Sequence, residues 1–314
     1  MSGALTDVRT DEMTAANSQA RVRTLRRDGL TLSARHFGPA DAPLVLLLHG
    51  FPDTPHSFDA VIPALLEAGY QVLAPWLRGY TRESADRRAR YDLMAVSADI
   101  AAWHRELGSP PAHLVGHDWG AFAATILAKQ SPPQWLSLTL LAIPPFGDGM
   151  PAAALRYLPR QTLLSSYIPV MQSGASPRLL TRDHAAFVRA LWRRWSPGWA
   201  FTDTDFAPTA AVFTDPLMAW SATRYYRSLF TVHRAATREF QRLLVAPWPA
   251  LPTLALAGAR DGCLSPDLQR VLAERAGATH ASIAGAGHFL HAERPGEVAA
   301  HLLPHLRAAS VPVR

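Results

Sequence analysis

The 314-residue sequence contains one cysteine, Cys263. A single cysteine excludes an intramolecular disulfide and cannot by itself supply a thiolate zinc site, and it is compatible with the reducing cytoplasm, where we expect the protein. Apolar runs of about eighteen residues are also missing, so we expect no membrane-spanning helix and no membrane partner. Residues 1–20 contain no apolar stretch of signal-peptide length, and we expect a flexible tail there rather than a secretion signal.

Lysine is nearly absent, because Lys129 is the only one, and the net charge of +6 comes from arginines. A basic chain can bind nucleic acid, but these arginines are scattered among alanines and prolines instead of forming a stripe. We therefore expect solvated surface charge and no nucleic-acid partner. The hydrophobic fraction of 48% is sufficient for a large buried core.

Short apolar runs alternate with helical patterns, which is typical of an α/β fold with a mostly parallel sheet and helices on both faces. The segments 21–26 and 30–37 flank Asp28-Gly29 and predict a β-hairpin. The run at 43–48 lacks polar alternation, as expected of a central strand. Further strands are predicted at 72–75, 113–115, 138–143, 252–257 and 281–283, and helices at 58–66, 94–107 and 119–129.

Strand character disappears after Gly147 and returns at Pro252. The intervening chain has helical pieces that are broken by prolines and rich in aromatic residues. Because the sheet resumes where it stopped, we interpret this stretch as a helical cap inserted into one sheet and not as an independent domain. We assign residues 21–147 and 247–314 to the core and 148–246 to the cap.

The candidate nucleophile is Asp118, which follows the strand 113–115 and opens the helix 119–129. Gly116 and Gly120 flank it at minus two and plus two, the pattern of a nucleophile elbow, where only small residues avoid a clash in the sharp turn. A carboxylate is ionised near neutral pH and can attack a saturated carbon directly to form an ester. The alternative is an ordinary turn in which Asp118 caps the helix.

Two later residues complete a catalytic set. Asp261 lies in the loop after the strand 252–257, and His288 lies in the glycine-rich loop after the strand 281–283. Catalytic groups of open α/β sheets gather at the carboxyl ends of the strands, so we expect both side chains to meet Asp118 there. Alternatively, Asp261 anchors its loop or caps the next helix, and His288 is a polar loop residue.

These residues resemble the α/β-hydrolases with an aspartate nucleophile, and among them the epoxide hydrolases. The resemblance covers about residues 21–310 and is strongest in the motifs His-Gly-Phe-Pro at 49–52, Leu-Arg-Gly-Tyr at 77–80 and Gly-His-Asp-Trp-Gly-Ala at 116–121, and around Asp261 and His288. The chain order nucleophile, acid, base is similar to theirs. Trp76 departs from the family pattern, in which many relatives have an aspartate; the departure concerns a local surface contact and not the mechanism.

The resemblance implies further roles in the cap and in the oxyanion site. Tyr167 stands five residues before Gln172, and Tyr226 directly precedes Arg227, spacings similar to those around the two cap tyrosines with which epoxide hydrolases bind and protonate the epoxide oxygen. Tyr225 competes with Tyr226 for this role and is otherwise expected to contact substrate. By the same resemblance, the backbone amides of Phe51 and Trp119 form the oxyanion hole, and their side chains line the substrate pocket.

The implied reaction is the opening of a small apolar epoxide to a vicinal diol through an ester on Asp118, which water activated by His288 and Asp261 then hydrolyses. It needs no metal and no organic cofactor. The alternatives are a haloalkane or haloacid dehalogenase and a non-catalytic member of the fold that binds an apolar ligand under its cap. We expect a monomer or homodimer.

Three further groups of residues have a structural interpretation at this point. His49 and His117 flank the nucleophile, but no third ligand with suitable spacing accompanies them, so we expect structural roles rather than a metal site. His291 is expected at the surface or behind the catalytic groups. The cap tryptophans Trp192, Trp195 and Trp199 are expected in the core.

Overall fold

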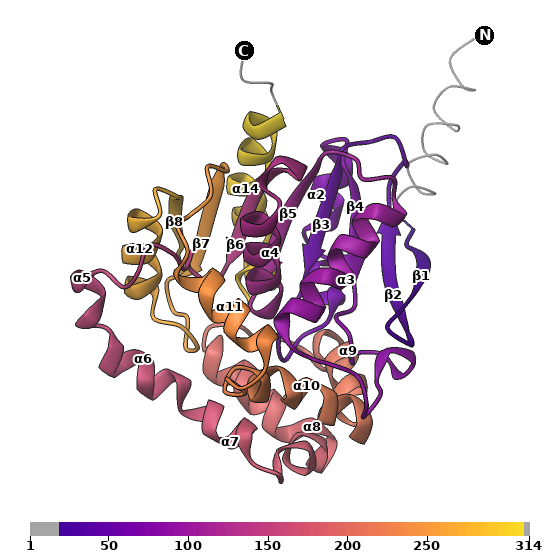
Figure 1. Cartoon of the computed structure of the whole chain (residues 1–314), viewed down its shortest axis with the longest axis vertical. Helices are drawn as coiled ribbons and strands as arrows, with labels where there is room; N and C mark the ends of the chain where they lie inside the picture. Colours follow the sequence, from indigo (N-terminus) through magenta and orange to yellow (C-terminus); the bar gives the residue numbers. More distant parts are fainter. Residues whose placement is uncertain (1–18, 311–314) are drawn as a thin grey trace.

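A computed structural model describes residues 19–310, so the tail expected at 1–20 lies almost entirely outside the described residues. The described part contains an eight-stranded sheet with helices on both faces and a further group of helices at one end of the sheet (Figure 1). The strands follow the order β1-β2-β4-β3-β5-β6-β7-β8. Their bounds are β1 Arg21–Arg27, β2 Leu30–Phe37, β3 Leu44–Leu48, β4 Gln71–Pro75, β5 Ala112–His117, β6 Trp135–Leu141, β7 Thr253–Gly258 and β8 Thr279–Ile283.

The first two strands are antiparallel, and β3 to β8 pair in parallel. Asp28 and Gly29 both have positive φ, 52° and 77°, as a two-residue type I′ turn requires, which confirms the predicted hairpin. The central strands β3, β4, β5 and β7 are buried at every residue, which explains why their sequences show no polar alternation. The predicted α/β class with a mostly parallel sheet is confirmed.

Helices cover both faces of this sheet. The helices α3 (Leu93–Glu106) and α4 (Trp119–Gln130) contribute to the hydrophobic cluster on one face. The helices α2 (Ile62–Glu67) and α14 (Pro295–Ser310) contribute to the cluster on the other. The helix α12 (Pro266–Arg275) packs against β7 and β8. Both apolar faces of the sheet are therefore removed from water, which is the main source of stability for such a fold.

The predicted start of the helix over 58–66 is wrong. A separate 3₁₀ helix, η1, spans Pro55–Phe58, and α2 begins only at Ile62. Pro63 explains the break, because its ring would clash with the carbonyl oxygen four residues earlier if the helix extended toward the N-terminus. Proline is tolerated in the first turn, which is where Pro63 lies.

Between β6 and β7 the regular structure is helical, and these helices form the cap. The register pairs Leu138 of β6 directly with Thr253 of β7, so the cap is an insertion between two neighbouring strands. In Figure 1 the helices α6 to α10 lie beneath the lower end of the sheet, and α11 lies between them and α4. Their bounds are α5 Ala152–Leu155, α6 Leu158–Leu164, η4 Ser165–Tyr167, α7 Ile168–Gln172, α8 Ser176–Trp195, α9 Asp203–Phe213, α10 Pro216–Ser228 and α11 Ala235–Val245.

Among residues 19–310, no helix combines the length and the apolar character that crossing a membrane would require.

Candidate active site

The nucleophile elbow is a strained turn between β5 and α4. Asp118 has φ 47° and ψ −117°, a backbone conformation that non-glycine residues rarely adopt and that is kept where the surrounding structure enforces it. A Cβ atom on Gly116 would lie 2.5 Å from the carbonyl oxygen of Gly120, and one on Gly120 would lie 2.1 Å from that of Leu48. Asp118 does not cap α4 with its side chain. The turn thus presents the carboxylate away from its own helix.

We expect the substitution Gly120→Ala to destabilise the protein by at least about 2–3 kcal/mol, because the carbonyl that a Cβ would meet belongs to the central strand β3 and cannot move aside. The control is Gly296→Ala in α14, where a Cβ would meet nothing within 4 Å and where alanine favours the helix. Urea unfolding measures both. Equal stability of the two variants would contradict the tight contact between elbow and sheet.

Two backbone amides point at the Asp118 carboxylate. The Phe51 amide donates a hydrogen bond of 2.7 Å to Oδ1 of Asp118, and the Trp119 amide lies close enough to lower the pKa of this carboxyl. Phe51 lies in the loop that follows β3, and Trp119 is the first residue of α4. The Phe51 amide therefore binds Oδ1 of the candidate nucleophile, and the other oxygen, Oδ2, faces Nε2 of His288.

The pKa of the Asp118 carboxyl depends on the groups around it. Burial raises the pKa of the Asp118 carboxyl above its ordinary value, whereas His288, His117 and the amide of Phe51 act in the opposite direction. A buried carboxylate needs such partners, because without them its charged form would be strongly disfavoured. Positive charge on His288 thus favours the ionised nucleophile.

His288 lies between the two carboxylates. Its Nδ1 is 3.1 Å from Oδ2 of Asp261, and its Nε2 is 3.9 Å from Oδ2 of Asp118. All three side chains are buried. Because a carboxylate only accepts, Nδ1–H donates to Asp261, and Nε2 of the neutral ring is left with a lone pair facing the nucleophile. This is the tautomer that a general base acting beside Asp118 requires.

Asp261 has further contacts that hold it in place. Its Oδ1 accepts hydrogen bonds from the amides of Cys263 (2.7 Å) and Leu264 (2.9 Å), and its Oδ2 accepts one from Gln269. Asp261 therefore anchors its own loop and also contacts His288, so loop anchoring and the proposed catalytic role are compatible. It does not cap α12, because Ser265 does so.

Burial alone lowers the pKa of His288, but the carboxylates of Asp261 and Asp118 outweigh it and raise the pKa above the ordinary value. Since Asp118 contributes to this increase, the pKa of His288 depends on whether the nucleophile is charged.

The two cap tyrosines lie next to each other, and the Asp118 carboxylate is close enough to affect both hydroxyls. The Tyr167 and Tyr226 rings lie edge to face with centroids 5.7 Å apart, and Tyr226 also packs on Phe51 (5.1 Å) and Trp119 (4.9 Å). Burial raises the pKa of both phenols well above 10, and the Asp118 carboxylate raises each further. Both hydroxyls are therefore protonated and can donate hydrogen bonds at neutral pH.

The residues that accompany these tyrosines in sequence hold their helices together. Gln172 in α7 donates to the carbonyl oxygen of Tyr226 (2.9 Å), and Arg227 in α10 donates to the carbonyl oxygen of Gln172 (2.8 Å). This reciprocal pair fixes the helix that follows Tyr167 against the one that carries Tyr226, which gives the spacings noted in the sequence a physical reason.

Tyr225 has a different environment. Its hydroxyl donates a hydrogen bond of 2.7 Å to the carbonyl oxygen of Arg78 in the core, and its side chain is fully buried. Its ring lies near Trp119, with centroids 6.1 Å apart. The Tyr226 hydroxyl, in contrast, is buried without a hydrogen bond of ordinary geometry to any residue from 19 to 310. Of the two neighbours, Tyr226 has the hydroxyl that is free to bind a ligand.

The C-terminal end of α8 is part of the site, although its tryptophans were expected only in the core. The carbonyl oxygen of Trp195 accepts hydrogen bonds of 3.0 Å from the amides of Gly262 and His288, in the two catalytic loops. The Trp195 ring lies 4.9 Å from that of Tyr167 and 5.2 Å from that of His288. Trp192 and Trp195 are buried in the cap, and Trp199 is partly buried. The sequence showed only an aromatic residue at a helix end, so the position of Trp195 in the site was missed.

Glu293 is a second residue that sequence reasoning missed. Its carboxylate accepts a hydrogen bond of 2.9 Å from the amide of Gly287, next to His288, and another from Ser196 at the end of α8. The Ser196 hydroxyl in turn accepts from the amide of Phe289 (3.2 Å). These bonds fix the histidine loop to the cap on both sides of the catalytic ring.

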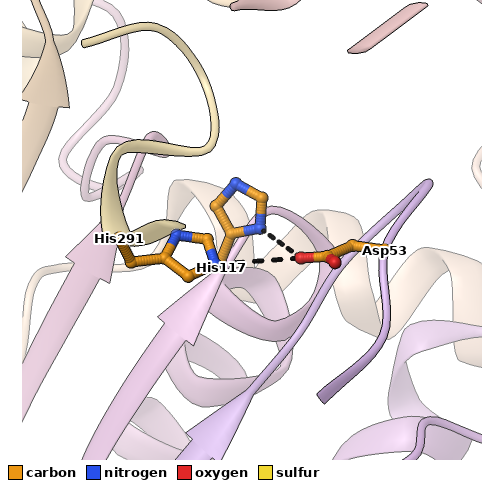
Figure 2. Close-up of side chains that lie close together, drawn as sticks. All are labelled: Asp53, His117 and His291. Atoms are coloured by element: carbon orange, nitrogen blue, oxygen red, sulfur yellow. Dashed lines mark ion pairs between the residues drawn. The ribbon is translucent and has the colours of Figure 1, made fainter. Parts of the chain in front are cut away.

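The histidines around the nucleophile are buried. His49 donates from Nδ1 to the carbonyl oxygen of Gly50 and accepts at Nε2 from the amide of Leu77, and burial lowers its pKa to about 4, so it is a neutral structural residue. His291 is not at the surface: it is fully buried behind the catalytic groups. His117 and His291 both face Asp53, as Figure 2 shows.

Sequence and structure comparisons show which known proteins this chain is similar to. The family model for the alpha/beta hydrolase fold matches residues 43–295. Epoxide hydrolase A of Mycobacterium tuberculosis is 30% identical over 312 residues, covering 90% of this chain and 96% of that protein. An epoxide hydrolase of Caballeronia sordidicola is 27% identical over 309 residues, covering 89% of this chain and 92% of that protein. The crystal structure of Epoxide Hydrolase A from Mycobacterium thermoresistibile superposes with a TM-score of 0.75 at 27% identity, covering 92% of this chain and 98% of that chain.

The chain therefore belongs to the α/β-hydrolase family, the class that its parallel sheet and its strand-turn-helix elbow define. Within that class it belongs to the epoxide hydrolases, a group of hydrolases acting on ether bonds. The family resemblance stated from the sequence motifs is confirmed.

Proposed function

We propose that this protein opens an epoxide to a vicinal diol through a covalent ester on Asp118. The observation that carries the proposal is the convergence of two protonated phenols, Tyr167 and Tyr226, on a buried carboxylate whose other side faces the His288–Asp261 pair. Nucleophile, acid and base are thus all present in one water-poor site.

In the first half-reaction, Oδ2 of Asp118 attacks a ring carbon and forms a C–O bond while the ring C–O bond breaks. The electron pair of the broken bond goes to the ring oxygen, where Tyr167 and Tyr226 donate hydrogen bonds and one of them transfers its proton. The product is an alkyl ester with a neighbouring hydroxyl. Oδ1 of Asp118 keeps its bond to the Phe51 amide, so the ester carbonyl forms already seated in the oxyanion hole.

In the second half-reaction, Nε2 of His288 takes a proton from water, and the hydroxide adds to the ester carbonyl carbon. The amides of Phe51 and Trp119 stabilise the oxyanion of the tetrahedral intermediate. Its collapse expels the alkoxide, which takes the proton from the imidazolium, and Asp118 is left as a carboxylic acid. The acid then loses its proton and the phenolate left by the first half-reaction regains one, which restores both groups. Asp261 orients the ring and stabilises its positive charge.

The side chains around the nucleophile support an apolar substrate. Phe51, Phe213, Trp119, Trp195 and Tyr226 contribute aromatic rings near the reacting carboxylate, and the groups that polarise the substrate are restricted to the two phenols. Such apolar surroundings suit an aryl or alkyl epoxide with one polar atom. We also propose that no metal or organic cofactor takes part, because each proton transfer has a residue to perform it.

The dehalogenase alternative has less support. A halide leaving group takes no proton, so it has no use for two phenols whose raised pKa values keep them protonated. A panel of aryl and aliphatic epoxides and haloalkanes, scored for diol and for halide, tests the choice. Diol from the epoxides is the expected result; halide release without diol would overturn the proposal and favour the dehalogenase.

The proposed mechanism also predicts how the rate of ester hydrolysis depends on pH. His288 must be unprotonated to act as base, so the rate falls as pH drops through its pKa. In the free enzyme the Asp118 charge helps to raise that pKa, and in the ester this charge is gone. We therefore expect the acid limb of ester hydrolysis at a lower pH than the titration of His288 in the free enzyme. Rapid-quench kinetics and NMR titration of the ring measure the two values, and an acid limb at or above the NMR value would contradict this coupling.

A further inference from the structure

A cluster of three side chains lies behind the nucleophile and takes no part in the proposed reaction. Asp53 lies in the loop after β3, His117 is the last residue of β5, and His291 lies in α13 (Leu290–Glu293). Figure 2 shows both imidazoles directed at one carboxylate oxygen. Oδ2 of Asp53 is 3.5 Å from Nδ1 of His117 and 3.8 Å from Nε2 of His291. All three side chains are buried, with exposed fractions of 1% or less.

The tautomer of His117 makes this cluster electrostatically unusual. Nε2 of His117 lies 3.1 Å from the carbonyl oxygen of His288, which can only accept, so Nε2 carries the proton. In the neutral ring, Nδ1 then directs a lone pair at the Asp53 carboxylate. Nδ1 of His117 and Oδ2 of Asp53 are both buried without a hydrogen-bond partner in the described part of the chain. A cation between these two acceptors, either a proton or a metal ion, would offset their repulsion away from water.

The geometry around that position suits a metal ion. The ligand atoms of Asp53, His117 and His291 all lie within 4.8 Å of one another. Ligand atoms about 2.0–2.1 Å from a tetrahedral zinc ion are separated by roughly 3.3–3.5 Å, so the site needs only a modest contraction. Nε2 of His291 is hydrogen-bonded to the Ser57 hydroxyl (2.9 Å), which itself donates to the carbonyl oxygen of Thr54 (3.1 Å). A bound ion would replace the contact between His291 and Ser57.

We propose that Asp53, His117 and His291 form a binding site for one divalent transition-metal ion of the zinc class. Two imidazoles and one carboxylate are the donor set that such ions select, whereas magnesium and calcium favour oxygen ligands. The sequence hid this site because its ligands are separated by 64 and 174 residues, from 53 to 117 and from 117 to 291, and because spacing alone offered His117 no third partner.

A cavity that borders the cluster offers a route for the ion, and Asp118 is not among its lining residues. A cavity of about 260 Å³ is lined by Asp53, Thr54, His56 and Ser57 from the core, and by cap residues including Trp192 and Trp199. An ion can therefore reach Asp53 without passing the epoxide site. Once bound, it ties together the loop of Phe51, the elbow of Asp118 and the loop of His288, because each of these segments supplies or adjoins one ligand. The ion thus has a structural role and stabilises the folded state.

The test uses untagged, chelator-treated full-length protein and Co²⁺ as a spectroscopic probe, followed by Zn²⁺ in calorimetry. The expected result is one ion per chain, visible absorption bands of four-coordinate Co²⁺, and a higher thermal midpoint with Zn²⁺. His291→Gln removes one ligand and should weaken binding at least about tenfold, and Asp53→Asn should do the same. Thermal midpoints in chelator establish that both variants fold, and substrate is left out so that the result does not depend on the proposed reaction.

The matched control is His56→Gln, at the cavity wall but 36% exposed and paired with Asp59. Its Co²⁺ affinity should equal that of the unaltered protein. Three results would overturn the proposal: no saturable Co²⁺ spectrum, which would leave a shared proton as the only cation in the cluster; unchanged binding in His291→Gln; or loss of binding in His56→Gln, which would place the ion at the surface.

Discussion

A His288→Gln protein incubated with a small excess of an aryl epoxide should gain the mass of one epoxide molecule and then turn over very slowly. Alkylation needs only the Asp118 carboxylate and the tyrosines, so it continues in this variant. Ester hydrolysis needs the base, whose loss costs about 10²–10⁴-fold. The covalent ester therefore accumulates and is measured by intact-protein mass spectrometry, and peptide mapping should locate it on Asp118.

Two controls make this result specific. Asp118→Asn should gain no mass, because a neutral amide is a poor nucleophile, and the exposed cap residue His233→Gln should turn over at the unaltered rate. A single turnover of the unaltered protein in heavy-oxygen water should leave the label in the Asp118 carboxylate, since water attacks the carbonyl carbon. Normal turnover by His288→Gln, or label only in the diol, would show that no hydrolysable ester forms on Asp118.

The convergence of the three candidate catalytic groups could be predicted because a topological rule relates them. Asp118, Asp261 and His288 each follow a strand that the sequence marks by apolar runs, and parallel strands bring their carboxyl ends to one edge. These three residues can therefore be predicted to lie close together even though they are far apart in the sequence. Elbow glycines were also predictable, because the turn leaves no room for a Cβ atom.

The cluster of Asp53, His117 and His291 could not be predicted in this way. Each residue lies in or beside a loop. The spacing of apolar residues predicts strands and helices, but it does not predict the path of a loop after a strand. Glu293 was hidden for the same reason, since its bond to Gly287 depends on how a short turn folds back. Trp195 was assigned correctly to a buried environment, but burial does not reveal that its carbonyl oxygen binds two catalytic loops.

The tyrosines bring together sequence pattern, packing and chemistry. Spacing to Gln172 and Arg227 pointed to Tyr167 and Tyr226, and the structure explains the spacing by the bonds between these two partners. The neighbouring Tyr225 has the same chemistry but donates its hydrogen bond to the Arg78 carbonyl oxygen. Which hydroxyl is free depends on the orientation of α10 about its axis. Side chains of adjacent helical residues point in directions about 100° apart.

Replacing Tyr226 by phenylalanine should therefore slow alkylation by an epoxide about 10²–10³-fold, the usual cost of removing one donor from a developing oxyanion. Tyr167→Phe should have a similar effect, and the double variant should show no measurable ring opening. The fold should survive both changes, because neither hydroxyl makes a hydrogen bond to the backbone within residues 19–310. Stopped-flow tryptophan fluorescence measures alkylation, and Trp119 beside Tyr226 is suitably placed to report it.

Tyr225→Phe is the matched control, since it removes the same hydroxyl one residue earlier. It leaves the buried carbonyl oxygen of Arg78 without its partner, so the free energy of unfolding should fall by about 1–3 kcal/mol while the alkylation rate stays unchanged. The opposite pattern, with slow alkylation in Tyr225→Phe and normal alkylation in Tyr226→Phe, would assign the proton donor to Tyr225. It would also require α10 to rotate when substrate binds, because the Tyr225 hydroxyl would have to leave Arg78 to reach the ring oxygen above Asp118.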